Sequence, residues 1–284
     1  MSFKIGFTAE TNRENTNATI STTVTATAAP RKSVVQVHFP ARGLTCAYYN
    51  DTFDLHKGDI VYVDGKLEGL RGRVVDVSYN FKIKLSDYKR VIGKADTDVK
   101  GDFYMAGSHF VSFDPTTLPF EKVITWFKAP AKEDDEFVSG SDGTTFRLDD
   151  LKGMNVSGTI AERGHDYYIE NKAVYLSIDG THGHAVVEGS EPYEVEFTYQ
   201  NGVIKDLTCS CFCSYNCKHA FAAMLQLRET LELIDKHYAD KYEHKCNSDR
   251  LKSRSLIIQK FRKEAMKFDC IKTESVRGIG LAWA

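Results

Sequence analysis

Four cysteines and a histidine crowd into one short stretch of the sequence. Cys209, Cys211, Cys213 and Cys217 lie within nine positions, and His219 follows two residues later. Thiolates and a neutral imidazole are ligands that zinc prefers, and three sulfurs with one nitrogen complete its tetrahedron. The chain has seven cysteines. An odd number with this clustering argues against a disulfide framework and for a metal site in a reducing compartment.

The spacing of these residues restricts the local backbone. Residues two apart on a strand face the same side, so Cys209 and Cys211 can reach one ion if the strand bends. Bending is required because Cα atoms about 6.6 Å apart must bring two sulfurs within about 4 Å of each other. Residues two apart on a helix point away from each other. This places Cys217 at or before a helix start and His219 in the first turn, where the helix dipole and Lys218 favour a thiolate.

The motif resembles the SWIM-type zinc finger, in which Cys-x-Cys, a spacer and Cys-x-His run into a helix. The chain is similar to bacterial members of that family over about residues 157–230. The likeness upstream of the motif lies in Glu162–Gly164, Tyr167-Tyr168, Val174, Val187–Ser190 and Tyr193–Val195. The likeness downstream lies in Ala222, Ala223 and Leu225. The resemblance implies β-hairpins before the finger, a helix after it, and a module that binds DNA or other proteins.

Five candidate ligands compete for four positions on the ion. Pairing Cys211 with Cys213 would leave only three residues before Cys217, which is a tight loop around a metal. The sequence departs from the family in its short spacer, and Phe212 stands where a proline is common. Cys213 is therefore kept as a reserve ligand. The predicted zinc ligands are Cys209, Cys211, Cys217 and His219.

The predicted zinc has a folding role. A catalytic zinc keeps one position open for water and usually has a carboxylate base nearby, whereas four protein ligands close the site. The sequence contains no Gly-rich phosphate loop, no G-x-S-x-G elbow and no H-E-x-x-H motif. No catalytic residue is predicted, and a metal-dependent enzyme ranks third among the hypotheses.

Other chemically suggestive clusters have plainer explanations. His182 and His184, with His165 upstream, could bind a second metal, but no Cys or carboxylate stands beside them at ligand spacing. They are predicted as solvated histidines at a Gly-rich hairpin tip. The acidic runs Asp149-Asp150 and Glu133–Glu136 lack a partner histidine or a nucleophile and are predicted as solvated loops.

Elements that would position the ligands follow from apolar patterning. Strands are predicted at residues 167–169, 174–178, 184–187, 193–199 and 203–204. Gln200-Asn201-Gly202 is a strong hairpin turn. Helical spacing predicts that the helix after the ligands lays one apolar face on the sheet, with Phe221, Met224, Leu225, Leu231, Ile234 and Tyr238 on that face. A second helix is predicted over Ser248–Phe268, with Ser248 or Asp249 as its cap.

The first half of the chain carries a different β pattern. A short alternating strand at 33–38 is followed by Lys57–Gly65, Gly69–Val77 and Phe81–Leu85, which are separated by Gly-containing turns. This rhythm is typical of a small, curved antiparallel barrel. Residues 55–91 resemble the KOW-type barrel, which implies docking on nucleic acid or protein.

The composition of the chain limits the classes of protein to which it can belong. At 284 residues with 42% hydrophobic and 27% charged residues, the chain suits two modest globular domains. It has no run of about 18 apolar residues and no basic-then-apolar leader, so we expect a soluble cytoplasmic protein with no membrane partner. The formal net charge of −2 excludes a polycation that coats nucleic acid indiscriminately.

Positive charge is nevertheless concentrated locally. Lys245–Lys272 holds nine Lys and Arg against three carboxylates, and the barrel segment interleaves cations with Tyr79, Phe81 and Tyr88. Cations mixed with stackable rings suit a nucleic-acid strand, and a solvated helix face with barrel-core aromatics is the alternative. The candidate nucleic-acid contacts are Arg71, Arg73, Lys82, Lys84, Arg250, Lys252, Arg254, Lys260, Arg262 and Lys263.

Together these patterns predict an α+β protein with a small antiparallel barrel, a hairpin-and-helix zinc module and C-terminal helices. The predicted divisions are a disordered tail at 1–32, the KOW-like barrel and its extension at 33–128, a linker at 129–155, the SWIM-type module at 156–240 and a basic helix and tail at 241–284. Nucleic-acid binding, to DNA rather than RNA, is the first functional hypothesis. A protein-interaction adaptor is the second.

Overall fold

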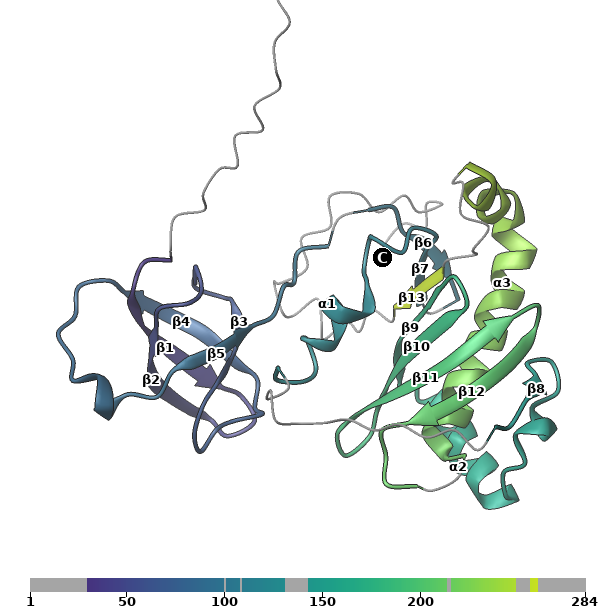
Figure 1. The fold of residues 1–284 in the computed structure, drawn as a ribbon, viewed down its shortest axis with the longest axis horizontal. Helices are drawn as coiled ribbons and strands as arrows, with labels where there is room; N and C mark the ends of the chain where they lie inside the picture. Colours follow the sequence, from purple (N-terminus) through teal and green to yellow (C-terminus); the bar gives the residue numbers. More distant parts are fainter. Residues whose placement is uncertain are drawn as a thin grey trace, which may run out of the picture.

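The structure is a computed structural model that describes residues 30–99, 101–107, 109–130, 143–213, 216–248 and 256–259. These residues form two antiparallel sheets; the longest helix packs on the larger sheet, and the second longest packs against that helix (Figure 1). The architecture is the α+β class that the sequence predicts. Of the predicted tail, only residues 30–32 are among those described.

The smaller sheet has five strands in the order β2-β1-β4-β3-β5. Its first strand alternates between buried and half-buried residues, which sends Val35, Val37 and Phe39 into the core. Val61 and Val74 meet them from the neighbouring strands. The strands predicted at 33–38, 57–65 and 69–77 are confirmed. The bounds are β1 Ser33–Phe39, β2 Leu44–Asn50, β3 Ile60–Val63, β4 Gly72–Ser78 and β5 Val91–Lys94.

The strand predicted at Phe81–Leu85 is wrong. Residues 81–84 have no regular structure and lead into a 3₁₀ turn, η1 (Leu85–Asp87), while β5 takes the place beside β3. Between β2 and β5, the two edge strands, the pairing is limited to an isolated bridge that joins Tyr49 of β2 to Arg90, the residue before β5. The sheet is therefore open, and the closed barrel that the sequence predicts is not formed by continuous strand pairing.

The larger sheet has eight strands in the order β6-β7-β13-β9-β10-β11-β12-β8. The central strands β9 and β10 are buried on both faces, which explains their near-continuous apolar sequences. Strands predicted at 174–178, 184–187, 193–199 and 203–204 are confirmed. The bounds are β6 Tyr104–Ala106, β7 His109–Ser112, β8 Phe146–Arg147, β9 Ala173–Asp179, β10 His182–Glu188, β11 Pro192–Gln200, β12 Val203–Cys209 and β13 Leu256–Gln259.

The predicted hairpin turn joins β11 and β12. Asn201 and Gly202 both have positive φ, 51° and 80°, as the tight two-residue turn requires. The turn returns β12 along β11 and sets the position at which the Cys-rich segment leaves the sheet.

One face of the larger sheet is covered by α3 (Lys218–Ser248), and α2 (Gly158–Ile169) packs against α3 (Figure 1). Met224 and Ile234 are fully buried in this core, as the helical spacing predicts for the apolar face, and Leu227, which was not predicted, is fully buried with them. The helical path is interrupted at Tyr238. No helix among the described residues is long and apolar enough to cross a membrane.

Two predictions of secondary structure are wrong near these helices. Residues 158–169 form α2, although Tyr167–Ile169 was expected to be a strand and the resemblance implied hairpins there. The helix predicted over Ser248–Phe268 contains instead β13, which pairs between β7 and β9. The short Leu-Ile-Ile run has high β propensity, and its pairing with two strands overrides the helical pattern of the residues around it.

Residues from the predicted linker and barrel extension also enter the larger unit. β8 and the 3₁₀ turn η2 (Leu151–Met154) lie within 129–155, and their Phe146, Leu151 and Met154 are buried in the core under α3. β6 and β7, from the barrel extension, pair along the other edge of the sheet.

The segment at residues 114–130, here called the connecting segment, lies between the two sheets. It includes the short helix α1 (Phe120–Ile124) and covers the second face of β9 and β10. The Tyr62 hydroxyl donates to the Thr125 carbonyl at 2.9 Å, and Arg71 Nη1 donates to the Trp126 carbonyl at 2.8 Å. Side chains of the smaller sheet thus bind the backbone of the connecting segment.

A matched pair of glycines in α2 tests its packing. A Cβ at Gly164 would lie 2.8 Å from Phe221 Cδ1 and 3.0 Å from the Lys218 carbonyl oxygen, while one at Gly158 meets nothing within 4 Å. We expect Gly164→Ala to lower the free energy of unfolding by about 1–3 kcal/mol through overpacking, despite the better helix propensity of alanine. Gly158→Ala should be neutral or stabilising. Chemical denaturation measures both, and a Gly164→Ala protein as stable as the native one would contradict the close approach of α2 and α3.

Candidate metal centre

The Cys-rich segment spans the end of one strand and the start of one helix. Cys209 is the last residue of β12, opposite Val195 of β11. Cys211 follows in a bend, and Cys217 directly precedes α3. The Ala220 N–H donates to Cys217 Sγ at 3.5 Å and the Phe221 N–H donates to the Cys217 carbonyl at 3.0 Å, so Cys217 caps the helix. The bent strand and the capping position both agree with the sequence analysis.

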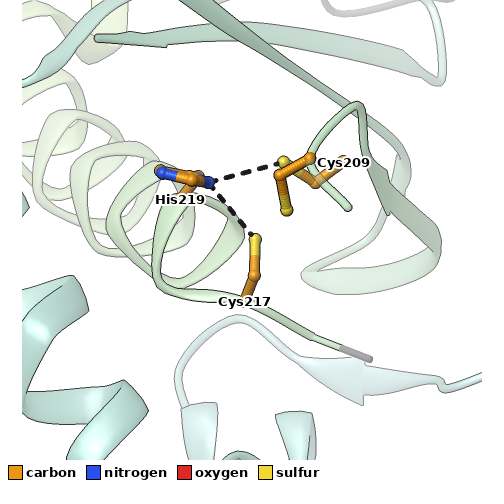
Figure 2. A group of neighbouring side chains, drawn as sticks. Cys209, Cys217 and His219 are labelled. Carbon is orange, nitrogen blue, oxygen red and sulfur yellow. Dashed lines mark hydrogen bonds between the residues drawn. The ribbon is translucent and has the colours of Figure 1, made fainter. Parts of the chain in front are cut away.

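Four of the five candidate ligands converge. One ligand atom from each of Cys209, Cys211, Cys217 and His219 lies within 4.8 Å of the others, and these four residues are here called the metal cluster. His219 Nδ1 lies 3.7 Å from Cys217 Sγ and 3.9 Å from Cys209 Sγ, and Figure 2 shows these three side chains turned toward one another. Ligand atoms about 2.0–2.3 Å from a tetrahedral zinc stand about 3.5–3.8 Å apart. The donor types and separations therefore fit zinc.

Hydrogen bonds and burial shift the pKa values of the three cysteines of the metal cluster in different directions. Cys217 Sγ accepts from the Cys209 thiol, from His219 and from the Ala220 N–H, and these bonds lower the pKa of Cys217 to about 4. Donation to Cys217, together with burial, raises the pKa of Cys209. Burial raises the pKa of Cys211 to about 11. A cation among the sulfurs would stabilise the ionised form of all three thiols.

Aromatic packing fixes the orientation of the histidine. The His219 imidazole stacks on the Tyr193 ring, with centroids 4.0 Å apart and planes at 17°, and Tyr167 lies 5.4 Å away. The second ring nitrogen, Nε2, is buried and has no hydrogen-bond partner among the described residues. A Cβ at Gly189 would lie 2.8 Å from the Tyr193 ring and 3.5 Å from Nε2. The ring is thus held with Nδ1 toward the sulfurs.

Cys213, the reserve ligand, is exposed and lies outside the metal cluster. Its backbone N–H hydrogen-bonds to Cys211, which lowers the pKa of that thiol against the effect of burial. Phe212 beside it is fully exposed. Phe212 and Cys213 lie on the loop between Cys211 and Cys217, outside the metal cluster. This short loop is therefore long enough for the other four ligands to meet without Cys213.

The metal cluster is connected to the rest of the fold through β11. Ser210 lies between Cys209 and Cys211. Its hydroxyl accepts a hydrogen bond from the Glu194 N–H, and its own N–H donates to the Glu194 carbonyl, both at 2.9 Å. The Glu194 carboxylate forms an ion pair with Lys128 of the connecting segment at 2.5 Å. The sequence analysis missed this contact because 66 residues separate the partners, and no motif marks either one.

The structure separates the predicted nucleic-acid contacts into groups. Arg71 bonds to the Trp126 carbonyl, so this guanidinium contributes to the contact between the sheets, and Arg73 is half-buried on β4. Lys82 and Lys84 are exposed. The remaining predicted contacts lie outside the described residues: Arg250, Lys252, Arg254, Lys260, Arg262 and Lys263.

The other groups of histidines and carboxylates noted in the sequence do not form a metal site among the described residues. Within the described residues, the metal cluster is the one group of three or more His, Cys, Asp or Glu side chains with metal-binding geometry. His182 is exposed as expected, but His184 is half-buried and stacks on Phe120 with centroids 4.4 Å apart, so its predicted solvation is wrong. Asp149 is exposed and pairs with Arg147 at 2.8 Å. The Glu133–Glu136 run lies outside the described residues.

Comparison with protein families identifies the same region. The model of the SWIM zinc finger family matches residues 193–228, which include β11, β12, the metal cluster and the first part of α3. The chain therefore carries a SWIM zinc finger whose Cys and His side chains are positioned to hold a metal ion, consistent with Zn²⁺. No curated protein and no solved structure matches the chain.

Two serine variants test the ligand set. Cys217→Ser should abolish stoichiometric zinc because a neutral hydroxyl is a far poorer zinc ligand than a thiolate. Cys213→Ser should retain the native zinc content because that thiol stands outside the cluster. Elemental analysis of protein purified in reductant gives the zinc-to-protein ratio. Full zinc in Cys217→Ser would refute the assignment, and loss in Cys213→Ser would make the reserve cysteine a ligand.

Removing the metal should destabilise the larger unit. Free zinc at a thousandfold excess over its Kd adds about 4 kcal/mol to folding, which for a unit of this size is about 8–16 °C in Tm. Calorimetry with and without a strong chelator measures the shift. Cys217→Ser is the control, because chelator should not lower its Tm further. An unchanged Tm in native protein shown to have lost its zinc would exclude a folding role for the ion.

Proposed function

We propose that this chain is a non-catalytic protein that binds nucleic acid and uses its zinc finger to stabilise the fold. Three sulfurs and one nitrogen from the protein fill the four positions of a tetrahedral ion, which leaves no position for a reacting water. The burial of Cys217 and His219 supports a structural role. Zinc held by thiolates requires a reducing environment, and we place the protein in the cytoplasm.

The observation that carries the proposal is the segregation of charge on the smaller sheet. The whole chain has a formal net charge of −2. Residues 79–90, here called the basic loop, contain four cations and one carboxylate, and Lys82 and Lys84 are exposed there. A local cationic surface on an otherwise balanced protein favours a polyanionic partner without indiscriminate binding. The likeness of residues 55–91 to KOW-type domains supports the same proposal, with DNA as the preferred partner.

A second candidate function, a protein-interaction adaptor, is favoured by one feature of the zinc finger. The Phe212 side chain is fully exposed at the loop of the metal cluster. A large exposed aromatic ring is a typical anchor in protein interfaces. A metal-dependent enzyme ranks third, because it would need an open coordination position.

A salt titration separates the first two functions. If about four cations contact phosphates, log affinity should fall against log salt with a slope of about −3. Fluorescence anisotropy of labelled oligonucleotides with the zinc-loaded full chain, from about 50 to 200 mM salt, measures the slope. An affinity that is independent of salt, or no binding to duplex or single strands at about 50 mM salt, would favour the adaptor.

A further inference from the structure

We propose that the basic loop, together with Arg31, forms a binding surface for single-stranded nucleic acid. The inference rests on the proposed function and refines it, because it names the surface and the form of the partner. It rests on three observations: the alternation of side chains along the loop, the stacking of arginines on its neighbouring rings, and the local charge.

The first observation is the alternation along residues 81–84. Phe81 and Ile83 are half-buried, and the Phe81 ring packs edge-on against Tyr49 of β2 at 6.2 Å. Lys82 and Lys84 between and after them are exposed, and Lys84 has extended dihedrals. Side chains two apart on an extended chain stand on one side, about 6.6–6.8 Å apart. The loop therefore presents both ammonium groups in a row on the solvent side, while its apolar residues fix it to the sheet.

The second observation is a pair of guanidinium groups on tyrosine rings. The Arg31 guanidinium lies over the Tyr79 ring, 4.4 Å from its centroid, and Tyr79 remains 38% exposed. Arg90 lies 5.4 Å from the centroid of the Tyr49 ring. A guanidinium over a ring offers its outer face as a plane on which an unpaired base can stack. Along the chain the row of lysines lies between these two contacts, since Tyr79 begins the basic loop and Arg90 ends it.

The third observation is the excess of cations that remain available. Arg90 is paired with Asp51 at 3.0 Å, and Asp87 accepts a hydrogen bond from Ser86. Lys82 and Lys84 have no ion-pair partner within 4 Å among the described residues. The row of lysines therefore keeps its full charge for a phosphodiester chain.

Single strands fit this surface better than duplex. In a duplex the base faces are buried in the stack, whereas a single strand exposes them to aromatic or guanidinium planes. Duplex readers place a helix or a β-ribbon in a groove, and the basic loop is neither over its described length. An acidic peptide could meet the lysines but has no planar base to stack on Arg31.

The principal test neutralises the lysine row. Lys82→Gln/Lys84→Gln should weaken binding of labelled 20-nucleotide oligo-dT and oligo-U by on the order of 10- to 100-fold at about 50 mM salt, and should reduce the salt slope by about 1.4. The control Lys152→Gln/Lys205→Gln removes two exposed lysines from the larger unit and should bind as the native chain does. Zinc content and Tm verify that each variant is folded. Oligo-dT and oligo-U distinguish DNA from RNA as the source of the strand.

A second variant separates stacking from charge. Arg31→Lys keeps the cation but loses the planar group over Tyr79, so affinity should fall about fivefold or more with the salt slope unchanged. Binding of single strands that is unchanged in Lys82→Gln/Lys84→Gln, or a preference for a 20-base-pair duplex, overturns this inference while the proposed function stands. Binding of a poly-Glu peptide in place of both nucleic-acid forms overturns both.

Discussion

The junction between β12 and α3 brings together three thiols and an imidazole, and a cation is needed for all three thiols to be ionised together. Three sulfurs and an imidazole nitrogen converge within 4.8 Å there, and Cys217 and His219 are buried. Neighbouring thiolates in such a place repel one another strongly because a protein interior screens charge poorly. Zinc removes that repulsion and satisfies soft donors at tetrahedral spacing. Because Cys217 caps α3, and α3 supplies Met224 and Leu227 to the core, fixing this junction fixes the helix on its sheet.

The consequences of that constraint extend beyond the zinc finger through short polar contacts. Ser210 lies between two ligands and pairs with Glu194, whose carboxylate binds Lys128 of the connecting segment. Two residues earlier, the carbonyl of Trp126 accepts a hydrogen bond from Arg71 of the smaller sheet. A continuous series of contacts thus runs from the metal cluster to the other sheet. Partly buried ion pairs of this kind contribute little stability by themselves, and their main effect is to define orientation.

The sequence predicted best where local chemistry is decisive. Ligand spacing required Cys217 at the helix start, and Asn201-Gly202 required a tight turn; both depend on a few adjacent residues. It failed where distant contacts decide. Tyr167–Ile169 has a β-like composition, yet it is helical in α2, which packs against α3 with Gly164 at the close approach. β13 is a strand because β7 and β9 leave a position between them, which no local pattern announces.

Hydrogen bonding also separates cations that look alike in the sequence. Arg71 and Lys82 are both exposed, but the Arg71 guanidinium donates to the Trp126 carbonyl of the connecting segment, whereas Lys82 faces solvent. Near the metal cluster, Lys172 and Lys218 lie over the Tyr167 ring, and Lys172 also pairs with Glu170. The smaller sheet and α3 lie on opposite sides of the connecting segment (Figure 1). The metal cluster therefore bears on the smaller sheet only indirectly: it fixes α3 on the larger sheet, and the connecting segment binds the smaller sheet through Tyr62 and Arg71.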